Sequence, residues 1–170
     1  MAGWIMTALC GVTGWKNSGK TTLVARLVTE FRNRGLKVAT IKHASDGFEV
    51  DHEGTDSYRH RDAGANQTLI GSGKRWALMH EVQPDESAPT LSELIGKLSP
   101  CDIVLIEGYK NEPHSKIECI RAASAKDTPV YQSNSTVVAV AHDGVAIENG
   151  LPAFNLDDIS SIADFTAEQI

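Results

Sequence analysis

Near its start the chain reads Gly14-Trp15-Lys16-Asn17-Ser18-Gly19-Lys20-Thr21-Thr22. These residues fit the pattern G-x-x-x-x-G-K-[ST], which is that of a P-loop. An apolar run, residues 5–12, precedes the pattern, and apolar residues at helical spacing follow it, from Leu23 to Phe31. A strand, a glycine-rich loop and a helix in this order are the context in which the pattern binds phosphate. We therefore predict a nucleotide-binding P-loop.

The residue types of this loop suit phosphate chemistry. Small residues let successive backbone N–H groups point at phosphate oxygens, and the start of a helix adds its positive dipole end. Lys20 would reach the β- and γ-phosphates, and the Thr21 hydroxyl would hold Mg²⁺. We predict that all nine residues, Gly14 to Thr22, line the phosphate site.

Length, charge and cysteine content exclude several classes of protein and partner. The chain has 170 residues, 16 Lys plus Arg and 22 Asp plus Glu, for a formal charge of −6. This length predicts one domain, residues 1–170, and the acidic balance argues against a nucleic-acid partner. Three cysteines without a C-x-x-C pair indicate neither a disulfide framework nor a zinc site, which favours the reducing cytoplasm. No apolar run approaches membrane-spanning length, so we expect no membrane partner.

Alternating strands and helices predict an α/β fold of the P-loop NTPase type. We expect a three-layer sandwich, with a mostly parallel sheet between helices on both faces. Residues 67–70 and 75–80, joined by a glycine-rich turn, predict an antiparallel hairpin extension. The other expected strands are residues 37–41, 103–106, 116–120 and 136–141, and the expected helices are residues 19–34, 57–63 (with Asp56 as N-cap), 90–98 and 157–170.

Candidate metal ligands follow two of the strands. Glu107 comes directly after the apolar run 103–106, and ligands in such sheets lie beyond the carboxyl ends of the strands. Glu107 is therefore predicted to hold Mg²⁺ with Thr21. Asp51, on the polar loop after residues 37–41, is the next candidate. That loop also offers Asp46, Glu49, Asp56, His43 and His52, whose roles the sequence leaves open, and Lys42, His43 and Lys110 are candidate anion ligands or solvated surface.

The nucleobase is not settled by the residues. Many GTP-binding P-loop proteins read guanine with N/T-K-x-D after a late strand. Here that place holds Val140-Ala141-His142-Asp143, so only the aspartate is present. Guanine and adenine both stay open at this point.

Several segments occur in a recognisable order. They are GVTGWKNSGKTTL (residues 11–23), VATIKHA (38–44), the run from Asp51 to Ala65, RWALM (75–79) and DIVLIEGYK (102–110). Together they resemble the molybdopterin-guanine dinucleotide biosynthesis protein B family, MobB. The family often has further histidines after IKH, where this chain has Ser45-Asp46-Gly47, and a proline where it has Glu53.

The resemblance implies a GTP-binding adaptor with Mg²⁺, weak GTPase activity at most, and a homodimeric state. It implies the guanylyltransferase of the same pathway as partner and molybdopterin as a candidate ligand. By position, Gly14 to Thr22 would hold the phosphates and Glu107 would lie at the metal edge. Two alternatives remain: a small-molecule kinase or ligase with the same loop, and a scaffold whose nucleotide site only stabilises the fold.

The predicted hairpin is also a candidate dimer interface, over Gln67 to Met79. A hairpin added to a sheet leaves an unpaired strand edge, which a two-fold pairing would bury on both subunits. Residues 75–79 bring Arg, Trp and Met, types enriched in interface cores. The alternative is a hairpin that folds back, with Trp76 in the core.

Overall fold

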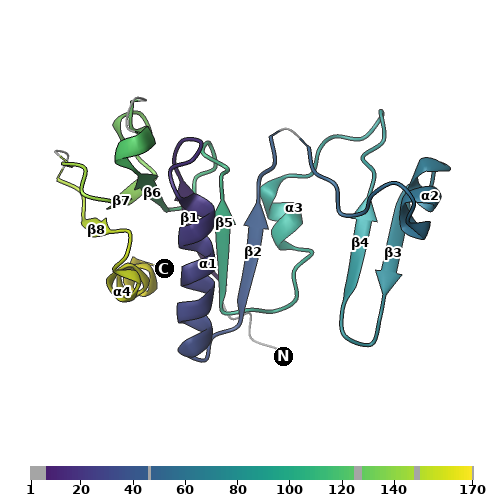
Figure 1. Ribbon diagram of the computed structural model, residues 1–170, viewed down its shortest axis with the longest axis horizontal. Coiled ribbons are helices and arrows are strands. Elements are labelled where there is room, and N and C mark those ends of the chain that lie inside the picture. Colours follow the sequence, from purple (N-terminus) through teal and green to yellow (C-terminus); the bar gives the residue numbers. More distant parts are fainter. Residues whose placement is uncertain (1–6, 46, 125–127, 148–149, 170) are drawn as a thin grey trace. The chain divides into compact units, whose positions relative to one another are not determined.

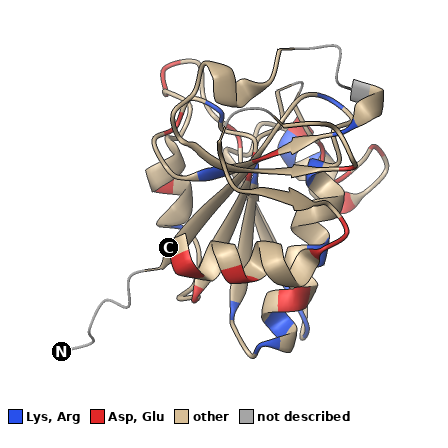
Figure 2. Ribbon diagram, turned by 90° about the vertical axis from the view of Figure 1, so that its left-hand side faces the viewer, with Lys and Arg blue, Asp and Glu red and all other residues tan. Residues whose placement is uncertain are grey.

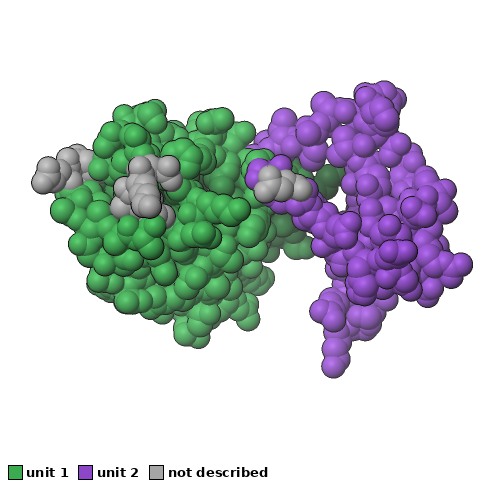
Figure 3. All heavy atoms as spheres, turned by 45° about the horizontal axis from the view of Figure 1, so that its top comes forward, with its two compact units in different colours: residues 1–43, 94–170 green, residues 44–93 purple. Residues whose placement is uncertain are grey.

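The computed structural model describes residues 7–45, 47–124, 128–147 and 150–169. Its contacts divide the chain into two compact units, coloured separately in Figure 3. Residues 1–43 and 94–170 form the first unit, which contains the P-loop. Residues 44–93 form the second, which is inserted into the first and ends within helix α3 (Leu91–Ile95).

The first unit is built on a six-stranded sheet with the order β2-β5-β1-β6-β7-β8, in which every pairing is parallel. The carboxyl ends of the strands point to the edge where the P-loop lies (Figure 1). Because β1 stands between β5 and β6, the loop leaves the middle of the sheet with a strand end on either side. The strands are β1 (Ala8–Thr13), β2 (Val38–Lys42), β5 (Ile103–Glu107), β6 (Lys116–Ile120), β7 (Val137–His142) and β8 (Ala153–Asn155).

Helices α1 (Lys20–Asn33) and α4 (Ile159–Gln169) pack side by side on one face of the sheet. Arg34, the C-cap of α1, ties the pair by a 2.6 Å ion pair with Asp164. Charged residues lie mostly on helices and loops, whereas the central strands carry few (Figure 2), as expected of strands buried on both faces. The core between helices and sheet includes Val12, Leu23, Leu27, Phe31, Leu105, Ile162 and Ala163.

On the opposite face of β1, at Gly11, the segment that follows β5 lies against the strand. A Cβ atom at Gly11 would lie 2.7 Å from His114 Nε2, so the imidazole fills the space a larger residue would take. The buried Lys116 holds this segment: its ammonium donates to the carbonyls of Glu112 and His114 and to Thr136 Oγ1. Three donors thus meet three acceptors, which satisfies the buried cation.

The second unit consists of α2 (Asp56–Asp62), the antiparallel hairpin β3 (Gln67–Gly71) and β4 (Trp76–His80), and the start of α3 (Leu91–Ile95). The predicted N-cap Asp56 is wrong. Thr55 caps α2, and its Oγ1 accepts the Tyr58 N–H at 3.4 Å. Both residue types cap well, and the helix begins one residue before its predicted start.

The α/β fold class is confirmed, with three differences of detail. The hairpin forms a two-stranded sheet of its own, separate from the six-stranded sheet, among the residues that the structure describes. The strand β8 was not predicted because three residues are too few for a period to show. The first strand begins at Ala8, and residues 5 and 6 of its predicted range lie outside the described residues. Among the described helices none is both long and apolar enough to cross a membrane.

Candidate functional site

The P-loop links β1 to α1 through backbone conformations that most residues avoid. Gly14, Asn17 and Gly19 have φ of 135°, 63° and 98°. The Trp15 carbonyl accepts the Ser18 N–H at 3.2 Å, which closes a tight turn. Gly19 is the N-cap of α1 and has no side chain to occupy the first N–H groups of the helix. Those groups and the helix dipole are therefore available to an anion, as the sequence predicts.

The Lys20 ammonium is held over this loop. Its Nζ donates to the Trp15 carbonyl at 2.6 Å. Burial lowers the pKa of Lys20 from its ordinary value, while the nearby Glu107 acts in the opposite direction. The cation therefore lies at the loop, where the motif places it for the phosphates.

Glu107 lies beside Thr21, as predicted for a metal site. The Thr21 hydroxyl donates to Glu107 Oε1 at 2.8 Å, and the Lys42 ammonium lies 3.4 Å from the same oxygen. The pairing of β5 with both β1 and β2 brings the three groups together. A carboxylate and a hydroxyl suit Mg²⁺, which is usually held by one or two protein oxygens together with phosphate and water. The donor set therefore fits the predicted ion.

Asp51, the third predicted metal ligand, has another partner. Its Oδ1 lies 2.8 Å from Arg61 Nη2, and both residues belong to the unit of residues 44–93. Burial would raise the pKa of Asp51, but Arg61 holds it below its ordinary value. An ion pair thus accounts for this carboxylate, and its metal role stays a prediction. Among the described residues no group of three His, Cys, Asp or Glu side chains is arranged to hold a metal.

The remaining candidates of the polar loop separate into two groups. His43 lies near the P-loop strand ends: its N–H donates to the Glu107 carbonyl at 2.9 Å, and its ring meets Tyr109 edge-on at 4.9 Å. The His52 carbonyl accepts the Thr55 hydroxyl at 2.8 Å in the turn before α2. Glu49 and Asp56 lie in the same unit as His52, and Asp46 lies outside the described residues.

The geometry agrees with comparisons to known proteins. A sequence model described as "Molybdopterin guanine dinucleotide synthesis protein B" matches residues 9–143. The chain belongs to the MobB family. It is 36% identical to the "Molybdopterin-guanine dinucleotide biosynthesis adapter protein" of Escherichia coli, over 99% of this chain and 96% of that protein. The protein with the same description from Haemophilus influenzae is 36% identical over 92% of this chain and 86% of its own length.

Solved structures lead to the same family. The crystal structure of Bacillus subtilis MobB has a TM-score of 0.74 and 27% sequence identity to this chain, and the match covers 96% of this chain and 98% of the other. The family predicted from the quoted segments is therefore confirmed.

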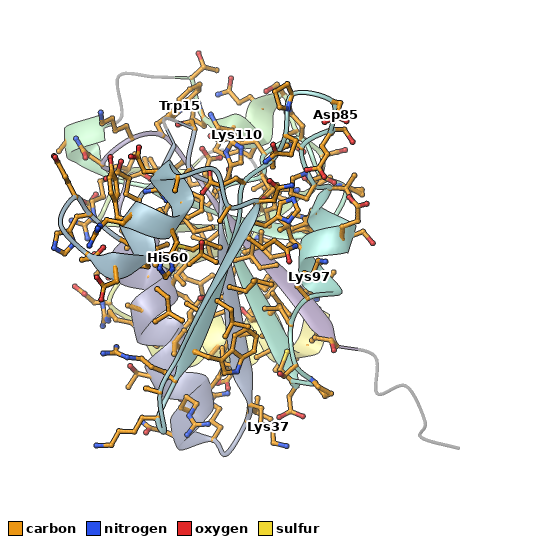
Figure 4. All side chains as sticks on the ribbon, turned by 90° about the vertical axis from the view of Figure 1, so that its right-hand side faces the viewer. Trp15, Lys37, His60, Asp85, Lys97 and Lys110 are labelled. Atoms are coloured by element: carbon orange, nitrogen blue, oxygen red, sulfur yellow. The ribbon has the colours of Figure 1, made fainter. Side chains whose placement is uncertain are left out.

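Around the MobB P-loop the structure shows contacts that the sequence did not predict. Lys110 Nζ lies 3.9 Å from the centre of the Trp15 ring, and both side chains are labelled in Figure 4. The Trp15 indole N–H also donates to the Thr128 carbonyl at 2.8 Å. Gly108 and Tyr109 both have positive φ, 91° and 49°, which turns the chain back toward the loop. The sequence does not reveal the positive φ of Tyr109, because tyrosine rarely adopts it, so this turn was not predicted.

The end of β6 forms the floor of the loop. A Cβ atom at Gly14 would lie 2.5 Å from the Cys119 carbonyl oxygen, and one at Gly19 would lie 2.8 Å from Arg121 Nε. The N–H of Ala122 donates to Asp143 Oδ1 at 2.9 Å. Asp143, the one residue of the guanine-reading pattern that is present, thus anchors the chain that carries Arg121.

A pocket of about 90 Å³ opens beside this floor. The Glu118 carboxylate forms part of its wall and accepts the N–H groups of Val130 and Tyr131 at 2.7 and 2.8 Å. Burial raises the pKa of Glu118, and these two hydrogen bonds lower it in part. The other lining residues are Trp15, Ser18, Cys119, Ile120, Pro129, Val145, Ala146 and Ile147.

Proposed function

We propose that this MobB family member is a GTP-binding adaptor in the biosynthesis of molybdopterin guanine dinucleotide, with weak Mg²⁺-dependent GTPase activity. It would assist the guanylyltransferase of that pathway. The observation that carries the nucleotide part is the pairing of a P-loop with Glu107 at 2.8 Å from the Thr21 hydroxyl. The adaptor part rests on relatives described as adapter proteins that match nearly the whole chain.

Each residue of the site has a separate task in this proposal. The backbone N–H groups and Lys20 bind the phosphates. Because the Thr21 hydroxyl donates its hydrogen to Glu107, its lone pairs are free to bind a cation. Mg²⁺ would neutralise the charge that develops on the β- and γ-phosphate oxygens during hydrolysis.

The kinase or ligase alternative needs room for a second substrate. Small-molecule sites usually measure about 300–1,000 Å³. The pocket beside the P-loop measures about 90 Å³, so it does not favour such an enzyme. The scaffold alternative predicts that nucleotide has no effect on binding of the partner, and we expect the opposite.

Calorimetric titration tests the nucleotide site. GTP should bind more tightly than ATP, and Mg²⁺ should strengthen GTP binding. Lys20→Ala should nearly abolish binding without loss of fold, because its ammonium serves the phosphates. Glu107→Gln should reduce Mg²⁺-dependent hydrolysis more than nucleotide binding, since the N–H groups of the loop remain. Equal affinity for ATP and GTP would reject the guanine assignment, and unchanged hydrolysis in Glu107→Gln would reject the metal role.

We also propose a homodimer whose interface uses residues 67–79. Leu69 faces Leu78 across the hairpin and Gly71 faces Trp76, so the three large apolar side chains share one face. Their exposed fractions are 65% for Leu69, 47% for Leu78 and 67% for Trp76. A face of this kind on a small unit favours burial against a second copy.

Sedimentation tests the dimer. The wild type should sediment as a dimer and Trp76→Glu as a folded monomer, because a carboxylate would be buried without a partner in the interface. Ser92→Glu, at an exposed position of α3 outside residues 67–79, adds the same charge and should stay dimeric. A monomeric wild type rejects the proposal, and a folded, dimeric Trp76→Glu variant places the interface elsewhere.

We place the protein in the cytoplasm, as the sequence predicts. The three cysteines are free, and burial raises the pKa of the Cys10 and Cys119 thiols to about 12. Such thiols are inert and suit a reducing compartment. Molybdopterin remains a proposed ligand, to be tested by titration in the same calorimeter.

A further inference from the structure

One cation at the P-loop has no role in the proposed function so far. Arg121 is the first residue after β6, the strand that pairs with β1 on the side away from β5. A Cβ atom at Gly19 would lie 2.8 Å from Arg121 Nε and 3.2 Å from both Cζ and Nη2. The guanidinium group therefore lies directly against the residue that precedes α1.

The position of this group across the sheet indicates which phosphate it meets. Glu107 and Thr21 mark the metal flank of the loop, at the end of β5. In P-loop proteins the metal side of the loop belongs to the β- and γ-phosphates, so in the proposed site those phosphates would face Glu107. Because β1 separates β5 from β6, the phosphate chain would then extend from Glu107 toward Arg121, with its α-phosphate on the Arg121 side.

The backbone around Arg121 is fixed. The Cys119 carbonyl packs under Gly14, and the Ala122 N–H donates to Asp143 Oδ1 at 2.9 Å. Two anchors, one before and one after Arg121, thus hold the base of its side chain beside the loop. A guanidinium group is always charged and presents several donors in one plane, which suits phosphate oxygens.

We propose that Arg121 binds the α-phosphate of the nucleotide, on the flank of the P-loop opposite Glu107. This inference rests on the proposed nucleotide site and adds a binding residue to it. Lys20 and Mg²⁺ serve the β- and γ-phosphates, whereas Arg121 serves a phosphate common to GTP and GDP. Its loss should therefore weaken the binding of both nucleotides by the same factor.

The experiment compares the wild type with Arg121→Gln, Arg121→Lys and Arg32→Gln in the full chain. Arg32 lies exposed in the last turn of α1, at the other end of the helix, and is the matched control. The affinities for GTP, GDP and inorganic tripolyphosphate are measured by calorimetry, and thermal unfolding checks the fold. Tripolyphosphate fills the loop without a nucleoside, so it separates a phosphate contact from a nucleobase contact.

We expect Arg121→Gln to weaken all three ligands about ten- to a hundredfold, the range for a lost charge-assisted hydrogen bond. Arg121→Lys should fold and lose about three- to tenfold, because a point charge replaces the planar fork. Arg32→Gln should bind as the wild type does. If Arg121→Gln does not fold, the Arg121→Lys measurement alone decides, and wild-type affinity in that variant overturns the proposal.

Other outcomes overturn the inference in distinct ways. Unchanged affinities in a folded Arg121→Gln variant make the side chain structural while the proposed function stands. Loss of GTP and GDP with unchanged tripolyphosphate binding assigns Arg121 to the nucleobase. A lower maximal rate with unchanged GDP affinity assigns it to the γ-phosphate. If tripolyphosphate binding depends on Arg121 but the wild type does not prefer GTP, the guanine assignment fails and this inference survives.

Discussion

Gly14 should be the glycine of the P-loop that tolerates substitution least. Its φ of 135° is a conformation that other residues adopt only at a cost of about 1–3 kcal/mol. A Cβ atom there would also lie 2.5 Å from the Cys119 carbonyl oxygen and 2.6 Å from Ser18 Oγ. The carbonyl belongs to β6 and cannot rotate away as a side chain could, and overpacking of this kind costs about 1–3 kcal/mol. We therefore expect Gly14→Ala to lower the free energy of unfolding by about 4 kcal/mol.

Gly35 provides the matched control. Its φ is 86°, and it ends α1 with its N–H bonded to the Arg32 carbonyl at 3.0 Å. No atom lies within 4 Å of a Cβ built there, among the residues that the structure describes. Gly35→Ala thus carries the conformational cost alone, about 1–2 kcal/mol. The difference between the two variants isolates the contact with β6.

Thermal unfolding measures this difference. About 1 kcal/mol shifts the midpoint by roughly 2–4 °C in a chain of this size. Gly14→Ala should therefore melt about 10 °C below the wild type, and Gly35→Ala about 4 °C below it. GTP affinity should fall in Gly14→Ala and stay unchanged in Gly35→Ala. Equal melting shifts in the two variants would refute the close approach of the P-loop to β6.

Three further predictions follow. Lys116→Met should lower the free energy of unfolding by about 3 kcal/mol in chemical denaturation, because the Glu112 and His114 carbonyls lose the ammonium that donates to them. Burial lowers the pKa of His114 from 6.5 to about 4, so between these values the unfolded chain binds a proton that the folded chain does not. The free energy of unfolding, measured in urea, should therefore decrease by about 2 kcal/mol when the pH is lowered from 7 to 5. Lys42→Gln should lower the Mg²⁺ concentration for half-maximal hydrolysis about two- to fivefold, since its ammonium lies 3.4 Å from Glu107.

Each of these three predictions has a control variant. Thr136→Val removes one acceptor of the Lys116 ammonium and should cost less than Lys116→Met; the reverse order contradicts the first prediction. His114→Gln should flatten the pH dependence, and an equal slope in both proteins assigns it to other groups. Lys37→Gln, just before the other end of β2, should leave the Mg²⁺ requirement unchanged. A Lys42→Gln variant with wild-type Mg²⁺ dependence removes that ammonium from the metal edge.

The sequence was sufficient for those parts of the site that depend on local pattern. A P-loop is a contiguous motif, so its strand, loop and helix follow from residues 5–31. The position of Glu107 beside Thr21 was predicted by a more general rule, because the carboxyl ends of all strands in a parallel sheet meet at one edge. That rule holds whichever strand stands beside β1, so the order of the strands was not needed.

The rest of the site depends on the order of the strands in the sheet or on local backbone conformation, and it could not be predicted from the sequence. Arg121 lies against Gly19 only because β6 pairs with β1, and 102 positions separate the two residues along the chain. The contact of Lys110 with Trp15 depends on the left-handed conformation of Gly108 and Tyr109. A sequence can suggest this conformation at a glycine but not at a tyrosine. Asp51 was predicted as a metal ligand because its partner Arg61 lies ten positions farther along the chain, on the separate helix α2, and spacing alone does not reveal their ion pair.

The floor under the P-loop has a consequence for binding. The Cys119 carbonyl and the Arg121 guanidinium pack where side chains of Gly14 and Gly19 would stand, so these contacts shape the loop without a ligand. If the loop binds nucleotide as proposed, little binding free energy is lost to ordering the loop. The contact of Lys110 with Trp15 lies at the same loop, and Lys110 belongs to the segment that follows Glu107. The P-loop and the chain after Glu107 thus meet at Trp15, so the proposed nucleotide, if it moved this indole, would move Lys110 as well.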